Sequence, residues 1–316
     1  MQIIKNLETI EYKEPIAVAL GFFDGLHIGH TALISKMVLL AKENNIKSAV
    51  FTFNTHPGNA LHSVSPQKML TDNADKAKLI ELLGVDYLII VPFCKSFQDL
   101  TPREFVQNVL VNSLKAKIIC VGEDYRFGAK ASGDVKTLVD LAKEYDLKVS
   151  ITEKITYNGE KVCSSYIRKL IADGDIPKAN ELLGYDFSIK QKVVSGKQLG
   201  RIIGIPTLNQ NIPENRLIPR LGVYATYVKL NDKLIPAVTN VGLRPTVDNK
   251  NLINLETHLI EENIDLYNEN IRVYYLKLLR SVKKFANTDE LVAQIAIDIK
   301  NSIKYFNKFK NNTKST

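Results

Sequence analysis

The stretch IAVALGFFDGLHIGH, residues 16–30, decides the fold of the first half of the chain. Its first five residues form an uncharged apolar run, which predicts a strand that is buried on both faces. A loop with glycines at positions 21, 25 and 29 follows, and the apolar spacing over 31–43 predicts a helix. A buried strand that leads through a glycine-rich loop into a helix is typical of parallel α/β sheets, which bind ligands at the carboxyl ends of their strands.

Apolar runs and amphipathic stretches continue to alternate as far as residue 185. Thr101 and Glu104 form a capping box with Pro102 at the first helical position, which marks one helix start. The alternation predicts an α/β domain with a doubly wound, mostly parallel sheet. The expected strands are 16–20, 48–53, 87–91, 117–121 and 148–152, and the expected helices are 31–43, 72–83, 102–112, 135–145, 164–172 and 176–183.

The pattern changes after Gly184, where apolar and polar residues begin to alternate with a period of two. Such runs, separated by turn residues, predict antiparallel strands, and a helical pattern returns only over 288–304. We therefore expect a small antiparallel β-barrel with a terminal helix. The predicted domains are 1–185 and 186–316. The expected barrel strands are 188–195, 223–230, 235–242, 253–260 and 271–279.

The composition is that of a globular protein, since 45% of the 316 residues are hydrophobic and 24% are charged. No stretch has the roughly 18 uncharged apolar residues that a membrane helix needs, so we expect no membrane association. The N-terminus shows no apolar core of a secretory signal. Cys94, Cys120 and Cys163 form no CxxC pair. Together these features predict a reduced, cytoplasmic protein.

The net charge of +8 belongs entirely to the second half. Residues 1–185 hold 22 basic and 22 acidic residues, whereas residues 186–316 hold 20 and 12. Lysines near the C-terminus are interleaved with Tyr305, Phe306 and Phe309, which is compatible with nucleic-acid binding. The alternative is a helix end that frays into a polar tail. We expect the tail, and no nucleic-acid partner.

The loop of residues 21–30 carries the first candidate chemistry. His27 and His30 are three residues apart at a helix start and share one face. Because helix N-termini favour anions, two imidazoles beside a glycine-rich backbone predict a phosphate-binding loop, with Asp24 as a candidate contact to a ribose or a metal. Two alternatives stay open: the histidines are structural, or Asp24, His27 and His30 bind a metal. The chain has no GxxxxGK[ST] pattern, which excludes a P-loop protein.

The string GFFDGLHIGH resembles the ATP-binding motif of the nucleotidyltransferase superfamily. FTFNTHPG (51–58), VGEDYRFGAKASGD (121–134) and CSSYIR (163–168) are similar to motifs of bacterial FAD synthetases, with Thr55, Tyr125, Cys163 and Ser165 in place of the usual Pro, Phe, Ser and Thr. The resemblance implies His27 and His30 as catalytic residues. It further implies an ATP site of Gly21, Phe23, Asp24, His27, His30, Ser164, Ser165 and Arg168, and a flavin site of His56, Pro57, Asp124, Tyr125 and Phe127.

The segment GRIIGIPTLNQNI, residues 200–212, carries the second candidate site. Thr207 and Asn209 are two residues apart, so on an extended segment their side chains face the same side. Their oxygens, together with nucleotide phosphates, would suit magnesium. The alternative is a tight turn in which Thr207 and Asn209 only complete local hydrogen bonds.

The same segment resembles the GxPTxN motif of riboflavin kinases. VTNVGLRPTV (238–247) and LETHLIEENIDLYNENIRVYYLKLLRSVKKF (255–285) resemble further segments of that family. The resemblance implies Glu256 as the general base that receives the proton of the riboflavin 5′-hydroxyl. His258 is expected to be a packing or hydrogen-bonding residue. The implied ATP- and magnesium-binding residues are Gly200, Gly204, Pro206, Thr207 and Asn209, of which Thr207 and Asn209 are the magnesium ligands.

The resemblance covers residues 10–300 and identifies the chain as a member of the bifunctional bacterial riboflavin kinase/FAD synthetase family. It implies phosphorylation of riboflavin to FMN, then adenylylation of FMN to FAD and pyrophosphate, with ATP as substrate and Mg²⁺ at both sites. The expected partners are riboflavin, FMN, FAD and ATP, and the expected state is a monomer or weak oligomer. Two alternatives are an enzyme that retains one activity and a flavin- or RNA-binding regulator with silent sites.

Overall fold

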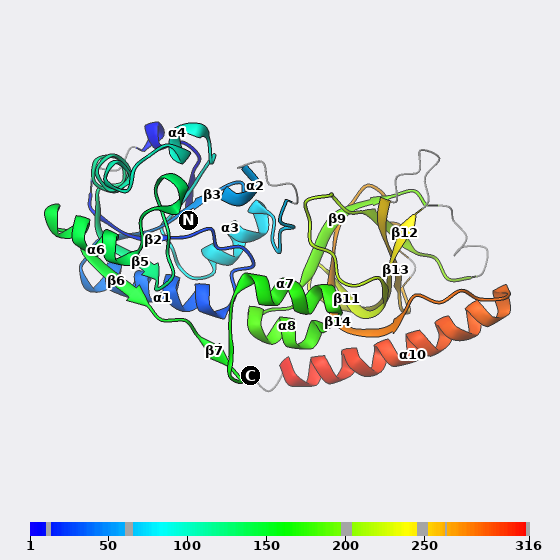
Figure 1. The fold of residues 1–316 in the computed structure, drawn as a ribbon. Helices are drawn as coiled ribbons and strands as arrows, with labels where there is room; N and C mark the ends of the chain where they lie inside the picture. The colour runs from blue at the N-terminus through cyan, green and yellow to red at the C-terminus, as the bar shows by residue number, and fades with distance from the viewer. Residues whose placement is uncertain (11–13, 61–65, 197–203, 245–251, 263, 314–316) are drawn as a thin grey trace. The chain divides into compact units, whose positions relative to one another are not determined.

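The computed structural model describes residues 1–10, 14–60, 66–196, 204–244, 252–262 and 264–313. Contacts divide the chain into two compact units, Met1–Ser164 and Ser165–Thr316 (Figure 1). This division falls before two helices that the sequence pattern groups with the first half. These contact units do not test where the two predicted functional domains divide, so the domain boundary expected between residues 185 and 186 stays a prediction.

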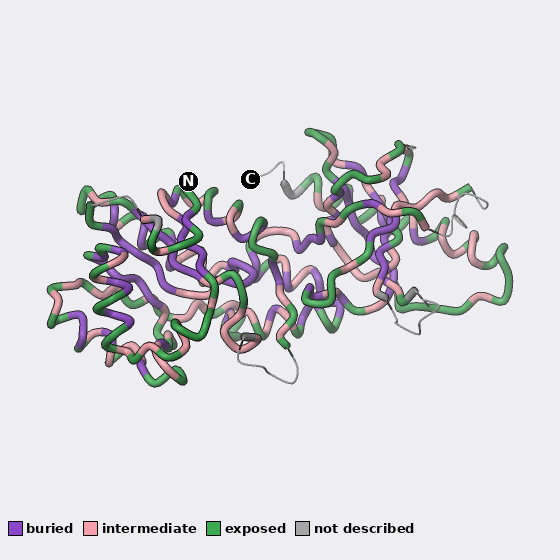
Figure 2. The backbone as a smooth tube through the Cα atoms, turned by 90° about the horizontal axis from the view of Figure 1, so that it is seen from above, coloured by how far each residue is buried: buried purple, intermediate pink, exposed green. Residues whose placement is uncertain are grey.

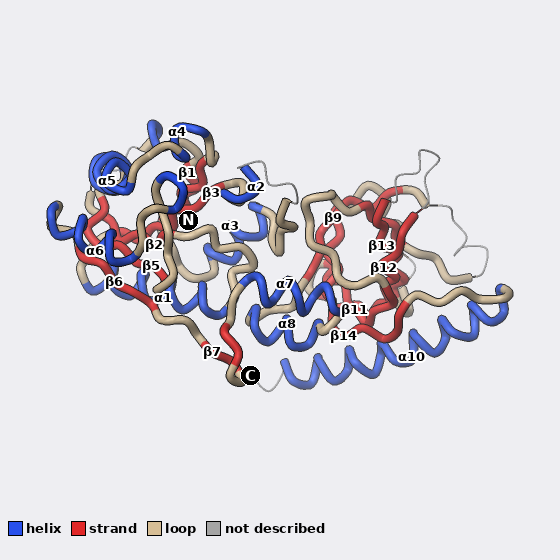
Figure 3. Tube along the Cα trace, in the orientation of Figure 1, coloured by secondary structure: helices blue, strands red, loops and turns tan. Residues whose placement is uncertain are grey.

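Six parallel strands form the sheet of the first unit (Figure 3). They are β1 (Gln2–Ile4), β2 (Ile16–Leu20), β3 (Lys47–Phe53), β4 (Tyr87–Val91), β5 (Ala116–Gly122) and β6 (Lys148–Thr152), in the order β1-β4-β3-β2-β5-β6. From β2 the chain proceeds outward to β3 and β4, then crosses to β5 and β6. The strand order reverses between β2 and β5, which is where such sheets bind ligands. The predicted doubly wound sheet is confirmed.

Helices cover both faces of this sheet. They are α1 (Ile28–Glu43), α2 (Pro57–Ala60), α3 (Asn73–Glu81), α4 (Lys95–Gln98), α5 (Pro102–Glu104), a π-helix over Phe105–Ser113, and α6 (Val135–Glu144). On one face α1 and α3 share a core cluster with Ala17 and Ala19 of β2, and on the other face the π-helix and α6 share a cluster with Ile16, Val18 and Leu20. All five residues of β2 are therefore buried, and Figure 2 shows long buried stretches of the chain inside this unit.

The segment predicted as one helix over 102–112 is more complex in the structure. The capping box of Thr101 and Glu104 and the role of Pro102 are confirmed, but the helix widens after Glu104. The amide of Leu114 donates to the carbonyl of Val109, five residues back, at 2.8 Å. Over two turns, the apolar spacing of an α-helix and that of a π-helix differ by little more than a residue, so the sequence pattern did not separate them.

Six antiparallel strands close into a barrel in the second unit. They are β9 (Ser188–Val194), β10 (Leu208–Asn211), β11 (Gly222–Leu230), β12 (Lys233–Arg244), β13 (Leu252–Leu259) and β14 (Asn270–Ser281), in the order β10-β13-β12-β11-β14-β9. The short strand β10 pairs with both β9 and β13 and so closes the barrel. The expected barrel is confirmed.

Three helices pack with this barrel: α7 (Ser164–Asp173), α8 (Ile176–Leu183) and α10 (Thr288–Thr313). The side-chain amide of Asn180 in α8 donates to the carbonyl of Tyr275 in β14, and its oxygen accepts from the amide of Phe187, which precedes β9. These bonds explain why α8 groups with the barrel rather than with the sheet.

The C-terminal helix is longer than the sequence predicts. The helical pattern was predicted to end at residue 304, whereas α10 continues to Thr313. Phe306 is only 5% exposed, and Phe309 stacks on Tyr227 of β11 at 4.9 Å between ring centroids. Two of the three aromatic residues that favoured nucleic-acid binding therefore pack on the barrel. In the described part of the chain, no helix is both long and apolar enough to cross a membrane.

Candidate active sites

The loop after β2 has a backbone shape that its own side chains fix. Phe23, Gly25 and Leu26 have φ of 54°, 78° and 33°, and this left-handed region is unfavourable for the two residues with a Cβ. The Asp24 carboxylate compensates, because it accepts hydrogen bonds from the amides of Leu70 and Thr71, both at 3.0 Å. Asp24 is 2% exposed. Its side chain therefore holds the loop closed against residues 70–71.

The two histidines meet at the start of α1. His27 caps the helix, since its Nδ1 accepts from the amide of His30 at 3.3 Å. The two rings stack with centroids 3.7 Å apart, which confirms that they share one face. In the described residues no group of three or more His, Cys, Asp or Glu side chains could hold a metal ion, so the metal alternative for Asp24, His27 and His30 has no support there.

A cavity of about 1030 Å³ opens at the carboxyl ends of β2 to β5, and we call it the aromatic cavity. It brings together predicted residues from three separate motifs: Gly21, Phe23, His30, His56, Pro57, Asp124, Tyr125 and Phe127. Asp24, His27 and Ser164 do not line it, although the Ser164 hydroxyl donates to the carbonyl of Asp24 at 2.9 Å. Ser165 and Arg168 belong to α7, in the second unit.

Much of this cavity wall was missed by the sequence analysis. Six rings that line the cavity were not among the predicted site residues: Phe22 after β2, Phe51 and Phe53 of β3, Phe93 after β4, Phe97 of α4 and Phe105. Phe53 lies edge-on to Phe93 and Phe97, with centroids at 4.8 and 5.4 Å. Phe93, Phe97 and Phe105 lie outside the quoted motifs, and the sequence analysis assigned no role to them. An aromatic wall of this kind suits a flat, conjugated ligand.

The far side of the aromatic cavity carries polar groups. Asp124 forms an ion pair with Lys154 at 3.0 Å, just beyond the end of β5. Tyr125 stacks parallel to Phe127 at 5.7 Å, and burial raises the pKa of its phenol. The phenol is therefore neutral at physiological pH and can offer a hydrogen bond from an otherwise apolar wall.

The second candidate site lies on β10 and β13 of the barrel. Asn209 and Glu256 are register partners across these strands. The Asn254 amide donates to Asn209 Oδ1 at 3.0 Å and approaches Glu256 Oε1 at 3.4 Å. A Cβ at position 196 would overlap the Asn209 amide, so Gly196 leaves the room that Asn209 occupies. The two residues predicted as magnesium ligand and general base are thus brought together, and Asn254 was missed.

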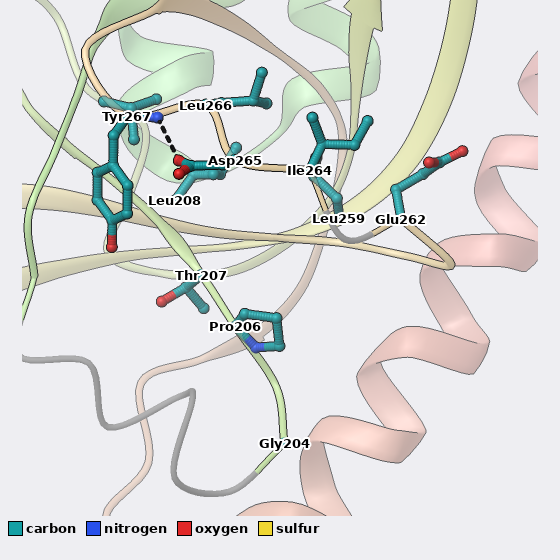
Figure 4. Close-up of a pocket in the computed structure, with 11 residues that line it drawn as sticks. Gly204, Pro206, Thr207, Leu208, Leu259, Glu262, Ile264, Asp265, Leu266 and Tyr267 are labelled. Carbon is teal, nitrogen blue, oxygen red and sulfur yellow. Dashed lines mark hydrogen bonds between the residues drawn. The ribbon is translucent and has the colours of Figure 1, made fainter.

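The segment before β10 is also fixed in place. His258 Nδ1 is 2.8 Å from the carbonyl of Pro206, which confirms a hydrogen-bonding role for His258 and orients Thr207 beside it. A cavity of about 490 Å³, the barrel cavity, is lined by Gly204, Pro206 and Thr207 and, across from them, by Asp265, Leu266 and Tyr267 (Figure 4). The last three were missed, because the sequence analysis assigned no site residue between the predicted strands over 253–260 and 271–279. Gly200 lies outside the described residues.

Known proteins resemble both halves of the chain. A family model described as FAD synthetase matches residues 9–166, and one described as riboflavin kinase matches residues 183–306. A bifunctional riboflavin kinase/FMN adenylyltransferase of Listeria monocytogenes is 35% identical over 92% of this chain and 92% of its own length. Its counterpart from Escherichia coli K12 is also 35% identical, over 94% and 96%. A crystal structure described as a macrolide-efflux protein from Streptococcus pneumoniae has a TM-score of 0.87 and 30% identity, covering 95% of this chain and 97% of that one.

Proposed function

Because the chain belongs to the family of bifunctional riboflavin kinases/FMN adenylyltransferases, we propose that residues 186–316 make FMN and residues 1–185 convert it to FAD. The enzyme phosphorylates riboflavin with ATP and adenylylates FMN with a second ATP. The observation that best supports this proposal is that each of the two matched halves has a cavity lined by residues of its own motifs.

Adenylyl transfer needs placement more than covalent chemistry. A phosphate oxygen of FMN attacks the α-phosphorus of ATP, the bond to the β-phosphate bridging oxygen breaks, and pyrophosphate leaves with the bonding electrons. No nucleophilic side chain is required. We assign the isoalloxazine ring to the aromatic cavity, where Phe53, Phe97 and Tyr125 offer faces and edges. His30 lines the same cavity, and with His27 and the N-terminus of α1 it would stabilise the phosphates.

Riboflavin phosphorylation is assigned to the barrel. The riboflavin 5′-hydroxyl attacks the γ-phosphorus of ATP and its proton passes to Glu256, while ADP leaves. A carboxylate suffices, because in a loose transition state the proton is transferred late. The Thr207 hydroxyl and Asn209 Oδ1 are hard oxygen donors that fit Mg²⁺ held jointly with nucleotide phosphates, and Mg²⁺ would neutralise charge on those phosphates. Tyr267 and the Gly204–Thr207 segment line the cavity proposed for ATP.

We place the enzyme in a reducing cytoplasm. None of its three cysteines, all within the described residues, forms a disulfide. The proposed ligands of the enzyme are riboflavin, FMN, FAD and ATP.

The direct test is chromatography of flavins after incubation of the purified protein with ATP, MgCl₂ and either riboflavin or FMN. We expect FMN and FAD from riboflavin, and FAD from FMN. If riboflavin gave FMN but neither tube contained FAD, the protein would have riboflavin kinase activity only. No product from folded protein would favour a flavin-binding regulator.

A further inference from the structure

Lys76 is a lysine with 0% of its surface exposed, in the second turn of α3. Burial of an ammonium group costs free energy unless hydrogen bonds and nearby charge compensate it. A methionine of the same length would fill the space without that cost. The retained charge therefore points to a use beyond packing, and no step of the proposed reactions employs it.

The Lys76 ammonium makes two contacts, both with the same residue. Its Nζ donates to the backbone carbonyl of Phe22 at 2.8 Å and lies 4.0 Å from the centre of the Phe22 ring. The Thr52 hydroxyl donates to the same carbonyl at 3.0 Å. A hydrogen bond and a cation–π contact from one cation fix both the backbone and the ring of Phe22.

Phe22 connects this buried cation to the aromatic cavity. It lies in the loop after β2, directly before Phe23 with its positive φ. Its ring lines the cavity, and the ring of His56 lies against it edge-on at 4.8 Å. Lys76 itself does not line the cavity. Among the residues that the Lys76 ammonium directly contacts, Phe22 is the one that lines the cavity.

The charged groups around Lys76 come from the same loop. Burial lowers the pKa of Lys76 to about 8, and the nearby Asp24 carboxylate opposes this shift. The other titratable group in contact with the Phe22 ring is His56, whose ring meets it edge-on. The ammonium is thus held between a buried carboxylate and an aromatic face. It is charged at neutral pH and loses its proton within the range of an ordinary assay.

We propose that Lys76 is a positioning residue for adenylyl transfer, because its ammonium fixes Phe22 and thereby the cavity wall between the phosphate loop and His56. This inference rests on the proposed FAD-forming site in the first unit. Lys76 touches neither substrate. Its loss displaces Phe22, which misaligns FMN relative to ATP and lowers the rate of transfer.

The test compares three variants of the full-length enzyme: Lys76→Met, Lys76→Arg and, as a matched control, Lys78→Met at an exposed position of the same helix. FAD formation from FMN gives kcat and KM, and FMN formation from riboflavin reports independently on each preparation. We expect Lys76→Met to lower kcat/KM for FAD formation by roughly tenfold to a hundredfold, as expected for a misplaced substrate. FMN formation stays unchanged, Lys76→Arg recovers part of the loss, and Lys78→Met behaves as wild type.

A pH profile separates positioning from simple loss of packing. Raising the pH through about 8 removes the proton from Lys76, so wild-type kcat/KM for FAD formation falls between pH 7.5 and 9.5. The Lys76→Met profile lacks this fall. The proposal would be overturned if Lys76→Met formed FAD with the same kcat and KM as the wild type. If that variant does not fold, a wild-type kcat/KM for FAD formation that does not change with pH would overturn it instead. A wild-type enzyme that makes no FAD would instead refute the proposed function.

Discussion

Asn209 and Glu256 lie directly opposite each other on the antiparallel strands β10 and β13. Residues in this position have their side chains about 5 Å apart at the Cβ atoms on one face of the sheet. The side-chain amide of Asn254 lies between them and contacts both. The barrel therefore holds a candidate metal ligand, a candidate base and a hydrogen-bond bridge as one cluster.

The first prediction concerns the base. Glu256→Gln keeps the size of the side chain but removes the carboxylate, so FMN formation from riboflavin should fall by roughly 10²- to 10⁴-fold. FAD formation from supplied FMN should not change, because the variant lies in the second unit. Glu269→Gln, at an exposed position of the same unit, is the matched control. Undiminished FMN formation by Glu256→Gln would exclude the assigned role.

The second prediction concerns the histidine pair. His27→Asn with His30→Ala should abolish FAD formation and preserve FMN formation, because the variant removes both imidazoles. Asparagine is chosen at position 27 because it retains an N-cap acceptor, whose loss from α1 would itself cost about 1 kcal/mol. Rates of both reactions and a thermal unfolding curve provide the measurement. A variant that folds normally and still makes FAD would show that the histidines are structural.

The third prediction concerns Asn254. Its replacement by alanine leaves Asn209 Oδ1 without its donor and the Glu256 carboxylate without its nearest amide. We expect a free-energy cost of about 1–3 kcal/mol in unfolding and a lower kcat for FMN formation. Asn270→Ala, at an exposed position of β14, is the control. Equal kcat values for the two variants would limit Asn254 to a structural role.

The fourth prediction follows from the pKa of Lys76, which burial lowers from 10.5 to about 8. Between these values the unfolded chain binds more protons than the folded one, so stability rises with pH through this window. The unfolding free energy of the wild type should therefore rise relative to that of Lys76→Met, by up to roughly 3 kcal/mol between pH 8 and 10.5. Denaturant unfolding at several pH values measures this difference in unfolding free energy. If the unfolding free energies of the wild type and Lys76→Met changed with pH in parallel, Lys76 would not be a buried lysine that titrates in this range.

The sequence predicted most of the elements because their periodicities are strong. The strands over 87–91 and 148–152 were placed at both ends correctly, since YLIIV is an uninterrupted apolar run and KVSIT alternates polar and apolar residues. Strand β10 was not predicted, because its four residues LNQN contain a single apolar side chain. Its place in the barrel depends on pairing with β9 and β13, which local sequence does not encode.

The candidate sites were predicted only as far as motifs extend. His30, His56 and Tyr125 come from motifs far apart in the sequence, and the structure gathers them at one cavity. Lys76 and Phe97 lie outside every motif, and their neighbours are set by tertiary packing. The helix was predicted to end at residue 304, which left Phe306 outside it, although the spacing of Phe306 from Ile303 and Phe309 fits one face of a helix.

The most direct test of the two-site account mixes the two singly inactivated enzymes, Glu256→Gln and His27→Asn/His30→Ala, in one tube with riboflavin, ATP and MgCl₂. Alone, the first should leave riboflavin unchanged and the second should stop at FMN. Together they should make FAD, because FMN released by one enzyme reaches the other through solvent. FAD made from riboflavin by either variant alone, or a mixture that stops at FMN, would contradict the account.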